Sequence, residues 1–310
     1  MDEPHDRNRN AGPQKPEQIR LRLPYRAPFA ARALFGFLAA RAVPGIEESD
    51  GDSYRRSLAL PHGLGVAELQ SHDDHIACTL RLGDMRDAAD AEQRCRRLLD
   101  LDADPTGVDA ALAMDPLLRP LVVRAPGLRV PGTIDGAELA LRAVIGQQIS
   151  VAGARTIAAR LVAAFGKPLT VPDGRLTHVF PDAEVVAGAD LRNIGMPGAR
   201  QAALKGLAKA LADGKIGVDP GVDRAETRAK LLELPGIGPW TASYIAMRAL
   251  GDPNAFMPTD LGVRRALARL GVTDDPEEIA NRWRPWRAYA QQHLWTSLVP
   301  GHDSSDSSSS

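Results

Sequence analysis

The segment at residues 230–269 constrains the fold of this chain more than any other stretch. It reads KLLELPGIGPWTASYIAMRALGDPNAFMPTDLGVRRALAR, and an elbow at 235–239, Pro-Gly-x-Gly-Pro, interrupts its helical pattern. Glycine and proline end one helix at such an elbow, and proline in a first turn favours the start of the next. We expect the helix before the elbow to begin near Asp223, the helix after it to end at Gly251, and a third helix to begin near residues 259–260.

The elbow also carries groups that are suited to binding an anion. It leaves free backbone N–H groups at the start of a helix, where the amides and the helix dipole suit a phosphate, and Gly236 and Gly238 let another backbone approach closely. The simpler interpretations are a tight turn for the elbow and an N-cap for Asp260. Trp240 and Tyr244, four residues apart, share one helix face, which on composition alone is more typical of a core stripe than of a ligand platform.

The combination of these features is far more specific than any one of them. LPGIGPWTA followed by PTD resembles the helix-hairpin-helix element and catalytic aspartate of the HhH-GPD DNA glycosylases, and within that superfamily the chain resembles the 3-methyladenine-DNA glycosylases II of the AlkA type. The same order of segments continues the resemblance in FGFLAARAVPGIE, YRRSLAL, PGLRVPG, LRAVIGQQISV, NIGMP and RWRPWRAYAQQHLW. It implies an α+β protein, mainly a helical glycosylase fold with a small N-terminal antiparallel α/β sheet domain.

Alternating and β-rich runs support a sheet in the N-terminal region. Residues 19–23 alternate as a strand does, and SYRRSLAL, LGVAELQS and HIACTLRL predict three consecutive antiparallel strands. Helical patterns at 29–42 and 88–101 accompany them. We interpret the domain, residues 19–103, mainly as a stabilising layer, with a lid or a partner surface as the alternative. Residues 1–18 are polar without an apolar period, which predicts disorder.

From residue 104 onward nearly every pattern is helical. The resemblance assigns 104–300 to a helical glycosylase region of two subdomains with the active-site cleft between them. Helices are predicted at 135–146 and 150–166, followed by short helices at 176–210 without a clear strand pattern. The serine-rich tail at 301–310 is expected to be disordered.

Composition narrows the class of protein. With 310 residues, 25% charged and 44% hydrophobic, the chain is typical of a soluble globular protein of two or three subdomains. Its net charge of −1 means that any DNA-binding surface must be local. The two cysteines, Cys78 and Cys95, argue against a disulfide framework and fit a reducing cytosol. No cysteine follows Cys95, so the C-terminal four-cysteine iron–sulfur site of some relatives cannot form.

The sequence carries no pattern of a signal peptide and no apolar run long enough to span a membrane. We therefore expect a cytoplasmic, nucleoid-associated monomer whose partner is damaged double-stranded DNA, without membrane contact.

The resemblance implies a site whose members lie far apart in the sequence. Asp260 would be the catalytic residue, and Trp240, Tyr244 and Trp295 would form the base pocket. The implied DNA-binding residues are Gln147, Gln148, Pro235, Gly236, Ile237, Gly238 and Thr241. In the family the loop of the glutamine pair enters the minor groove and fills the gap left by a flipped base. Gln148 stands where a leucine acts as the wedge, and its amide can hydrogen-bond the orphaned base, whereas leucine can only wedge.

The implied chemistry is release of a damaged base after its extrusion from the duplex. N-alkylated purines such as 3-methyladenine and 7-methylguanine carry positive charge, which suits a π-rich pocket and makes them good leaving groups. Asp260 would stabilise the cationic sugar and orient or deprotonate a water, and its place near a helix N-terminus favours the ionised form.

Two further hypotheses remain beside this alkylpurine glycosylase. A bifunctional glycosylase–lyase for other damaged bases is disfavoured because Trp240 occupies the position of the lysine nucleophile, so a monofunctional enzyme is expected. A non-catalytic helix-hairpin-helix DNA-binding module is disfavoured by Asp260. No cofactor is expected for catalysis. The resemblance alone implies a structural monovalent or divalent cation at the hairpin, held by the backbone carbonyls of Leu232, Leu234 and Ile237.

Overall fold

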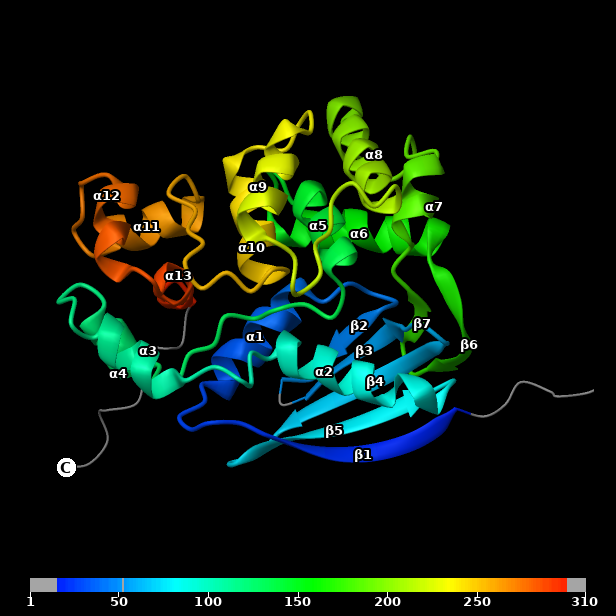
Figure 1. Ribbon diagram of the computed structural model, residues 1–310, viewed down its shortest axis with the longest axis horizontal. Coiled ribbons are helices and arrows are strands. Elements are labelled where there is room, and N and C mark those ends of the chain that lie inside the picture. The colour runs from blue at the N-terminus through cyan, green and yellow to red at the C-terminus, as the bar shows by residue number, and fades with distance from the viewer. Residues whose placement is uncertain (1–15, 52, 300–310) are drawn as a thin grey trace, which may run out of the picture.

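The computed structural model describes residues 16–51 and 53–299. The disorder predicted for 301–310 and for most of 1–18 lies outside the described residues, which enter the first strand at Glu17. Figure 1 shows a sheet domain at the lower right, one group of helices above it and a second group of helices to the left.

The N-terminal domain is built on a five-stranded antiparallel sheet, in the order β1-β5-β4-β3-β2. Its strands are β1 Glu17–Pro24, β2 Glu47–Ser49, β3 Ser53–Ala59, β4 Leu64–Ser71 and β5 His75–Leu82. Every second residue of β5 is buried, as expected of a strand with one face on a core. The three consecutive strands predicted from alternation are confirmed. Alternation does not predict the short β2, because three residues carry no period.

Two helices cover one face of this sheet. They are α1 Ala31–Arg41 and α2 Ala88–Leu98, within the two helical patterns seen in the sequence. Leu34 and Phe35 of α1 share a buried apolar cluster with Cys95 of α2 and with Leu69 and Leu80 of the sheet. Burial of side chains of this size, each worth roughly 1.5–3 kcal/mol, stabilises the layer.

A β-hairpin from the later part of the chain packs on the opposite face. Its strands, β6 Lys167–Asp173 and β7 Leu176–Val179, pair antiparallel, and their apolar residues contact Val66 of β4. The hairpin thus covers the face of the sheet opposite α1 and α2, so the N-terminal domain has three layers.

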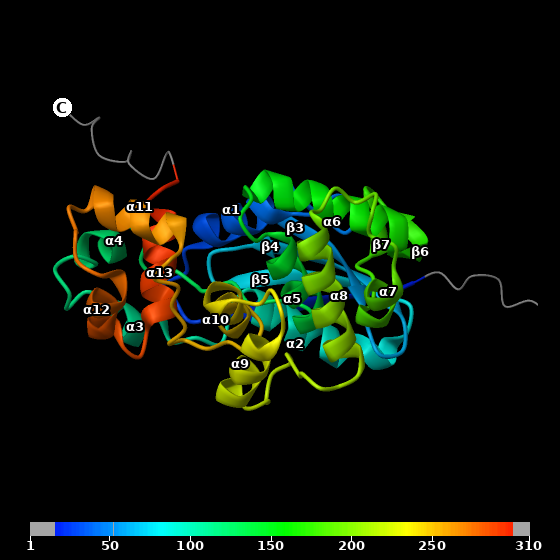
Figure 2. The same ribbon diagram turned by 90° about the horizontal axis from the view of Figure 1, so that it is seen from above.

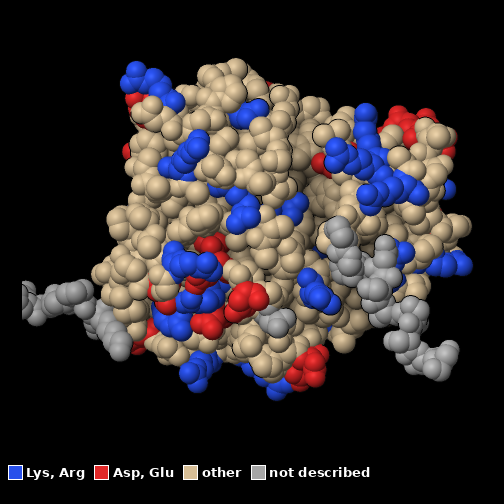
Figure 3. Space-filling view, turned by 180° about the vertical axis from the view of Figure 1, so that it is seen from behind, with Lys and Arg blue, Asp and Glu red and all other residues tan. Residues whose placement is uncertain are grey.

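The expectation of short helices without a strand in the region that includes 176–210 was therefore wrong in its first residues. Two prolines in β6 mask its alternation, and the pairing depends on tertiary contacts that local patterns do not contain. Asp173 near the hairpin turn forms ion pairs with Arg55 and Arg81 of the sheet, at 2.5 and 3.0 Å. Figure 3 shows basic and acidic side chains closely mixed over this part of the surface, at the lower left.

The remaining chain forms two groups of helices that both views separate (Figures 1 and 2). The group on the left consists of α3 Pro105–Leu112, α4 Arg119–Arg124, α11 Leu261–Arg269, α12 Pro276–Ala280 and α13 Arg287–Thr296. The group above the sheet consists of α5 Gly136–Ile145, α6 Val151–Phe165, α7 Ala183–Gly188, α8 Gly198–Ala212, α9 Arg224–Glu233 and α10 Pro239–Arg248. The mainly helical fold expected after residue 104 is confirmed.

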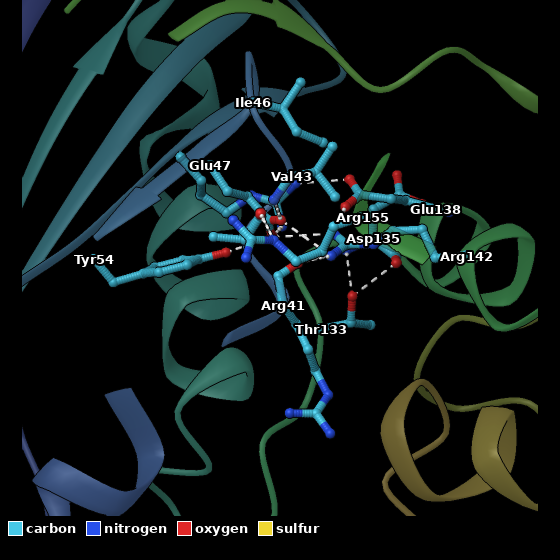
Figure 4. Close-up of polar contacts among 12 residues, drawn as sticks. Arg41, Val43, Ile46, Glu47, Tyr54, Thr133, Asp135, Glu138, Arg142 and Arg155 are labelled. Atoms are coloured by element: carbon cyan, nitrogen blue, oxygen red, sulfur yellow. Dashed lines mark hydrogen bonds and ion pairs between the residues drawn. The ribbon is translucent and has the colours of Figure 1, made fainter. Parts of the chain in front are cut away.

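A buried cluster of four charges joins the sheet domain to these helices (Figure 4). Glu47 of β2 and Glu138 of α5 each contact both Arg56 of β3 and Arg142 of α5, with N–O distances between 2.7 and 3.3 Å. Burial raises the pKa of Glu47, but the two arginines outweigh it and lower that pKa to about 2. Removing one partner from such a cluster leaves a buried charge uncompensated, at a cost of about 3–5 kcal/mol.

One buried titratable group makes stability depend on pH. His293 on α13 is buried, and burial lowers the pKa of its imidazole to about 4, against a smaller opposite effect of the Leu121 backbone. The unfolded chain therefore binds a proton that the folded protein excludes, and this group's contribution to stability is lost as the pH falls from about 6.5 towards 4.

We expect His293→Gln to remove this dependence. Between pH 7 and pH 5 the free energy of unfolding of the variant should improve relative to the unsubstituted protein by roughly 2 kcal/mol. Urea denaturation at the two pH values measures the difference. A difference that stays constant with pH would contradict the buried neutral imidazole.

Candidate active site

The three helices predicted around the elbow are present. Asp223 caps α9 by accepting a hydrogen bond from Glu226 N at 2.9 Å, Gly238 precedes α10, and α11 begins directly after Asp260. The helix after the elbow ends at Arg248, three residues before the glycine expected to stop it.

The two glycines of the elbow have different constraints. Gly236 has a φ of +84°, which favours glycine, and a Cβ there would lie 2.6 Å from the Cβ of Ala203 on α8. Gly238 has an ordinary φ of −95°, and a Cβ there would meet nothing within 4 Å. Packing within the protein therefore explains why position 236 needs glycine. At position 238 only a bound partner would exclude a larger side chain.

The glutamine pair lies in the turn between α5 and α6, as predicted, but its two members face different surroundings. Gln147 donates from Nε2 to the carbonyl of Gly236 and to the hydroxyl of Thr241, both at 2.9 Å. Gln148 is exposed and adopts a left-handed backbone with φ of +56°. Gln147 thus fixes the turn to the elbow, and Gln148 is the residue that the turn presents.

Asp260 is both an N-cap and the centre of a hydrogen-bonded group. Its Oδ1 accepts from the amide of Val263 at 3.0 Å and from Nε1 of Trp295 at 2.8 Å, and its Oδ2 accepts from Nε1 of Trp240 at 2.9 Å. The two interpretations of this aspartate, cap and site residue, are therefore compatible. Three N–H donors hold one carboxylate against the cleft.

Two of the three predicted pocket aromatics, Trp240 and Trp295, contact this carboxylate, and the third, Tyr244, stacks on Trp240. Trp240 and Tyr244 stack with centroids 5.3 Å apart, and Trp295 stacks on Phe37 at 6.2 Å. A Cβ at Gly262 would lie 2.8 Å from Cδ1 of Trp295, so only glycine, which has no side chain, fits beside the indole. Trp240, Tyr244, Gly262 and Trp295 border a cleft of about 1460 Å³, which the glutamine turn and the elbow also border.

Sequence reasoning missed the residues that complete the deep wall of the cleft. They are Arg41 of α1 and Arg248 of α10, whose Nη1 donates to the Tyr244 hydroxyl at 2.8 Å. Phe37 of α1 stacks on Trp295 without bordering the cleft itself. The interpretation of the N-terminal domain mainly as a stabilising layer was therefore incomplete, because α1 also lines the cleft. The signal was present in FGFLAARA, whose Phe and Arg are four residues apart on one helix face.

The carbonyls expected to hold a cation lie at the junction of α9 and α10. Leu232 and Leu234 belong to the C-terminal end of α9, where carbonyls lack helical partners and the dipole favours a cation. The Leu234 carbonyl accepts a hydrogen bond from Ile237 N at 3.1 Å, which leaves it a second lone pair. Within 16–51 and 53–299, no group of three or more His, Cys, Asp or Glu side chains could hold a metal.

Comparison with known proteins assigns the class. Residues 141–288 match the HhH-GPD superfamily of base excision DNA repair proteins, and residues 20–135 match the AlkA N-terminal domain. The chain is thus a member of the HhH-GPD superfamily of base excision DNA repair proteins, with an AlkA-type N-terminal domain.

The particular family follows from a curated relative. The chain is 35% identical over 283 residues to DNA-3-methyladenine glycosylase 2 of Escherichia coli (strain K12). The aligned region covers 88% of this chain and 95% of that protein. The chain belongs to the AlkA-type DNA-3-methyladenine glycosylase family of the HhH-GPD superfamily, and the resemblance inferred from its motifs is confirmed.

Other relatives extend this result. The chain is 51% identical over 283 residues to the Probable bifunctional transcriptional activator/DNA repair enzyme AlkA of Mycobacterium tuberculosis (strain ATCC 25618 / H37Rv). That match covers 90% of this chain and 57% of the relative, so the chain spans little more than half of that protein's length. Among solved structures, the 3-methyladenine DNA-glycosylase from Archaeoglobus fulgidus has the same fold, with a TM-score of 0.77 and 24% identity over 90% of this chain and all of that one.

The different constraints on the elbow glycines predict different outcomes for alanine. Gly238→Ala should fold with unchanged stability, yet bind abasic-analogue DNA at least about tenfold more weakly at low salt, where phosphate contacts contribute most. Gly236→Ala should instead lower the thermal unfolding temperature, because it strains the backbone and meets α8. Fluorescence anisotropy and thermal unfolding separate the two effects. Unchanged affinity of Gly238→Ala would mean that the elbow is only structural.

Proposed function

We propose that the chain is a monofunctional DNA glycosylase that extrudes an alkylated purine, such as 3-methyladenine or 7-methylguanine, from duplex DNA and hydrolyses its glycosidic bond. The observation that carries this proposal is the Asp260 carboxylate, held by the indoles of Trp240 and Trp295 at the edge of an aromatic cleft. Family membership and the name of the Escherichia coli relative support the same substrate class.

The reaction needs an anion beside the sugar more than it needs an acid. The bond between C1′ and the purine nitrogen breaks, and its electron pair leaves with the base. The remaining oxocarbenium-like sugar is stabilised by the Asp260 carboxylate across the cleft. Water then adds to C1′ and gives up a proton, for which Asp260 is the acceptor, and an abasic site remains.

The stacked aromatics supply the pocket for the extruded base. The faces of Trp240, Tyr244 and Trp295 offer electron-rich surfaces, which favour a cationic purine by roughly 1–2 kcal/mol when water is excluded. Gln148, which is exposed on its turn, would enter the gap that the extruded nucleotide leaves.

The same proposal includes how the protein holds DNA. The elbow amides would bind a backbone phosphate, with the carbonyls of Leu232, Leu234 and Ile237 holding a cation that bridges to it. The cation would supply positive charge to the phosphate and has no part in bond cleavage. We also propose that the protein acts as a monomer on the nucleoid. No helix within the described part of the chain is long and apolar enough to cross a membrane.

Asp260→Asn tests the catalytic assignment. Asparagine keeps a capping oxygen but removes the charge, and its amide N–H₂ opposes an indole N–H. We expect base release to slow by at least about a hundredfold, while binding to abasic-analogue DNA persists. Single-turnover release from methylated DNA measures the rate.

Asp275→Asn is the matched control, since Asp275 caps α12 by accepting from Glu277 N at 2.9 Å and does not border the cleft. Its rate of base release should equal that of the unsubstituted protein. Near-normal release by Asp260→Asn would exclude Asp260 from catalysis.

Monofunctional action predicts the form of the product. Trp240 occupies the position of the lyase lysine, and no lysine borders the cleft among the described residues. The product strand should therefore stay intact until hot alkali cleaves it, and borohydride should trap no covalent enzyme–DNA adduct. Denaturing gels of both reactions are the measurement. A trapped adduct would favour the bifunctional alternative, and no base release at all would favour the non-catalytic DNA-binding module.

A further inference from the structure

The deep wall of the cleft carries two guanidinium groups. Arg41 and Arg248 both border the cleft, and their Cζ atoms lie 3.6 and 4.9 Å from the ring centroid of Phe37. Neither arginine forms an ion pair with a carboxylate of residues 16–51 or 53–299. An aromatic pocket that suits cationic bases therefore also contains fixed positive charge.

The two arginines differ in how many donors they have left. Arg248 is buried, and its guanidinium donates to the carbonyls of Pro131 and Gly132 and to the hydroxyl of Tyr244. Arg41 is mostly buried, donates from Nη1 to the carbonyl of Phe37 at 3.3 Å and also hydrogen-bonds the hydroxyl of Tyr244. Since a guanidinium has five N–H donors, Arg41 keeps donors that can reach a bound molecule.

The charge of Arg41 acts on the pocket aromatics. Burial raises the pKa of the Tyr244 hydroxyl, but the guanidinium groups of Arg248 and Arg41 outweigh it and bring that pKa below its ordinary value. Arg41 and Arg248 thus place positive charge beside Tyr244, although the net charge of the chain is −1.

The buried charge cluster fixes the position of Arg41 without neutralising it. Arg142 donates to the backbone carbonyl of Arg41, and Arg155 donates to that of Ala42, both at 2.8 Å. These bonds hold the C-terminal end of α1 against α5 and α6. Figure 4 shows the Arg41 side chain pointing away from the carboxylates of Glu47 and Glu138.

We propose that Arg41 is a specificity-determining residue, whose guanidinium donates a hydrogen bond to an acceptor on the deep edge of an extruded neutral purine. This inference rests on the proposed function. Hypoxanthine carries a carbonyl oxygen at C6, which matches the donor. 3-Methyladenine carries an amino group at the same ring position and a positive charge, so Arg41 opposes both. Arg41 thus offsets the advantage that leaving-group ability and π-stacking give to cationic bases, and it extends the substrates of the site to neutral purines.

The test compares two bases in one pocket. Single-turnover release of hypoxanthine and of 3-methyladenine is measured for the unsubstituted protein, Arg41→Gln and Arg41→Lys. We expect Arg41→Gln to lower hypoxanthine release at least about tenfold, the scale of one hydrogen bond to a charged group, without lowering 3-methyladenine release. Arg41→Lys keeps the charge but loses the planar donors, so its ratio of the two rates should fall between the others.

Arg32→Gln is the matched control, because Arg32 is an exposed arginine of the same helix that does not border the cleft. Its ratio of rates should be that of the unsubstituted protein. Equal losses on both bases in Arg41→Gln, or an unchanged ratio, would overturn the role of Arg41 and leave the proposed function standing. If Arg41→Gln does not fold, the ratio in Arg41→Lys decides in the same way. Release of neither base by the unsubstituted protein would overturn the proposed function and this inference together.

Discussion

The four-charge cluster of Glu47, Arg56, Glu138 and Arg142 is the interaction on which the shape of the cleft depends. It is buried between the sheet domain and α5, and every carboxylate in it contacts two arginines. Such a cluster adds little net stability over apolar packing, but its directional contacts specify one arrangement of the two parts. Through the bond from Arg142 to the end of α1, that arrangement determines where the N-terminal domain enters the cleft.

The arrangement of the two parts also affects how the proposed catalytic carboxylate, Asp260, is held. Phe37, carried by α1, stacks on Trp295, and the indole of Trp295 donates to Asp260. The second indole donor, Trp240, comes from the helix after the elbow. Asp260 is therefore fixed by side chains from α10 and α13 and supported from α1, three helices far apart in the sequence. A carboxylate held in place before substrate arrives needs no reorganisation when positive charge develops on the sugar.

Local patterns were sufficient for the parts of the fold with strong periods or turn residues. The elbow, its flanking helices and the strands β3, β4 and β5 could be predicted, because Pro-Gly-x-Gly-Pro and alternating apolar residues are local signals. The hairpin β6–β7 could not, since ion pairs and apolar contacts with a distant sheet stabilise it.

The candidate site shows the same division. Asp260 and the three pocket aromatics could be placed from their motifs, and the structure brings them together. The role proposed for Arg41 could not, because it depends on a charge in a cleft that exists only after the two domains pack, although the helix that carries Arg41 was recognisable. The resemblance singled out Gln148 as the wedge, but the sequence could not show what Gln147 does, because its two hydrogen bonds form only when the folded chain places the elbow beside it.

These two hydrogen bonds of Gln147 link DNA binding to base extrusion in the proposed mechanism. Gln147 donates to the Gly236 carbonyl, so the turn that presents Gln148 is joined directly to the elbow proposed to hold a phosphate. The left-handed backbone of Gln148 is uncommon outside glycine and costs of order 1–3 kcal/mol, which the surrounding turn must offset. A phosphate bound at the elbow would therefore set the distance at which Gln148 meets the base stack, because one hydrogen-bonded unit carries both contacts. In the proposed mechanism, the wedge and the phosphate site would act at a fixed spacing, and extrusion of the base would follow from where the backbone is held.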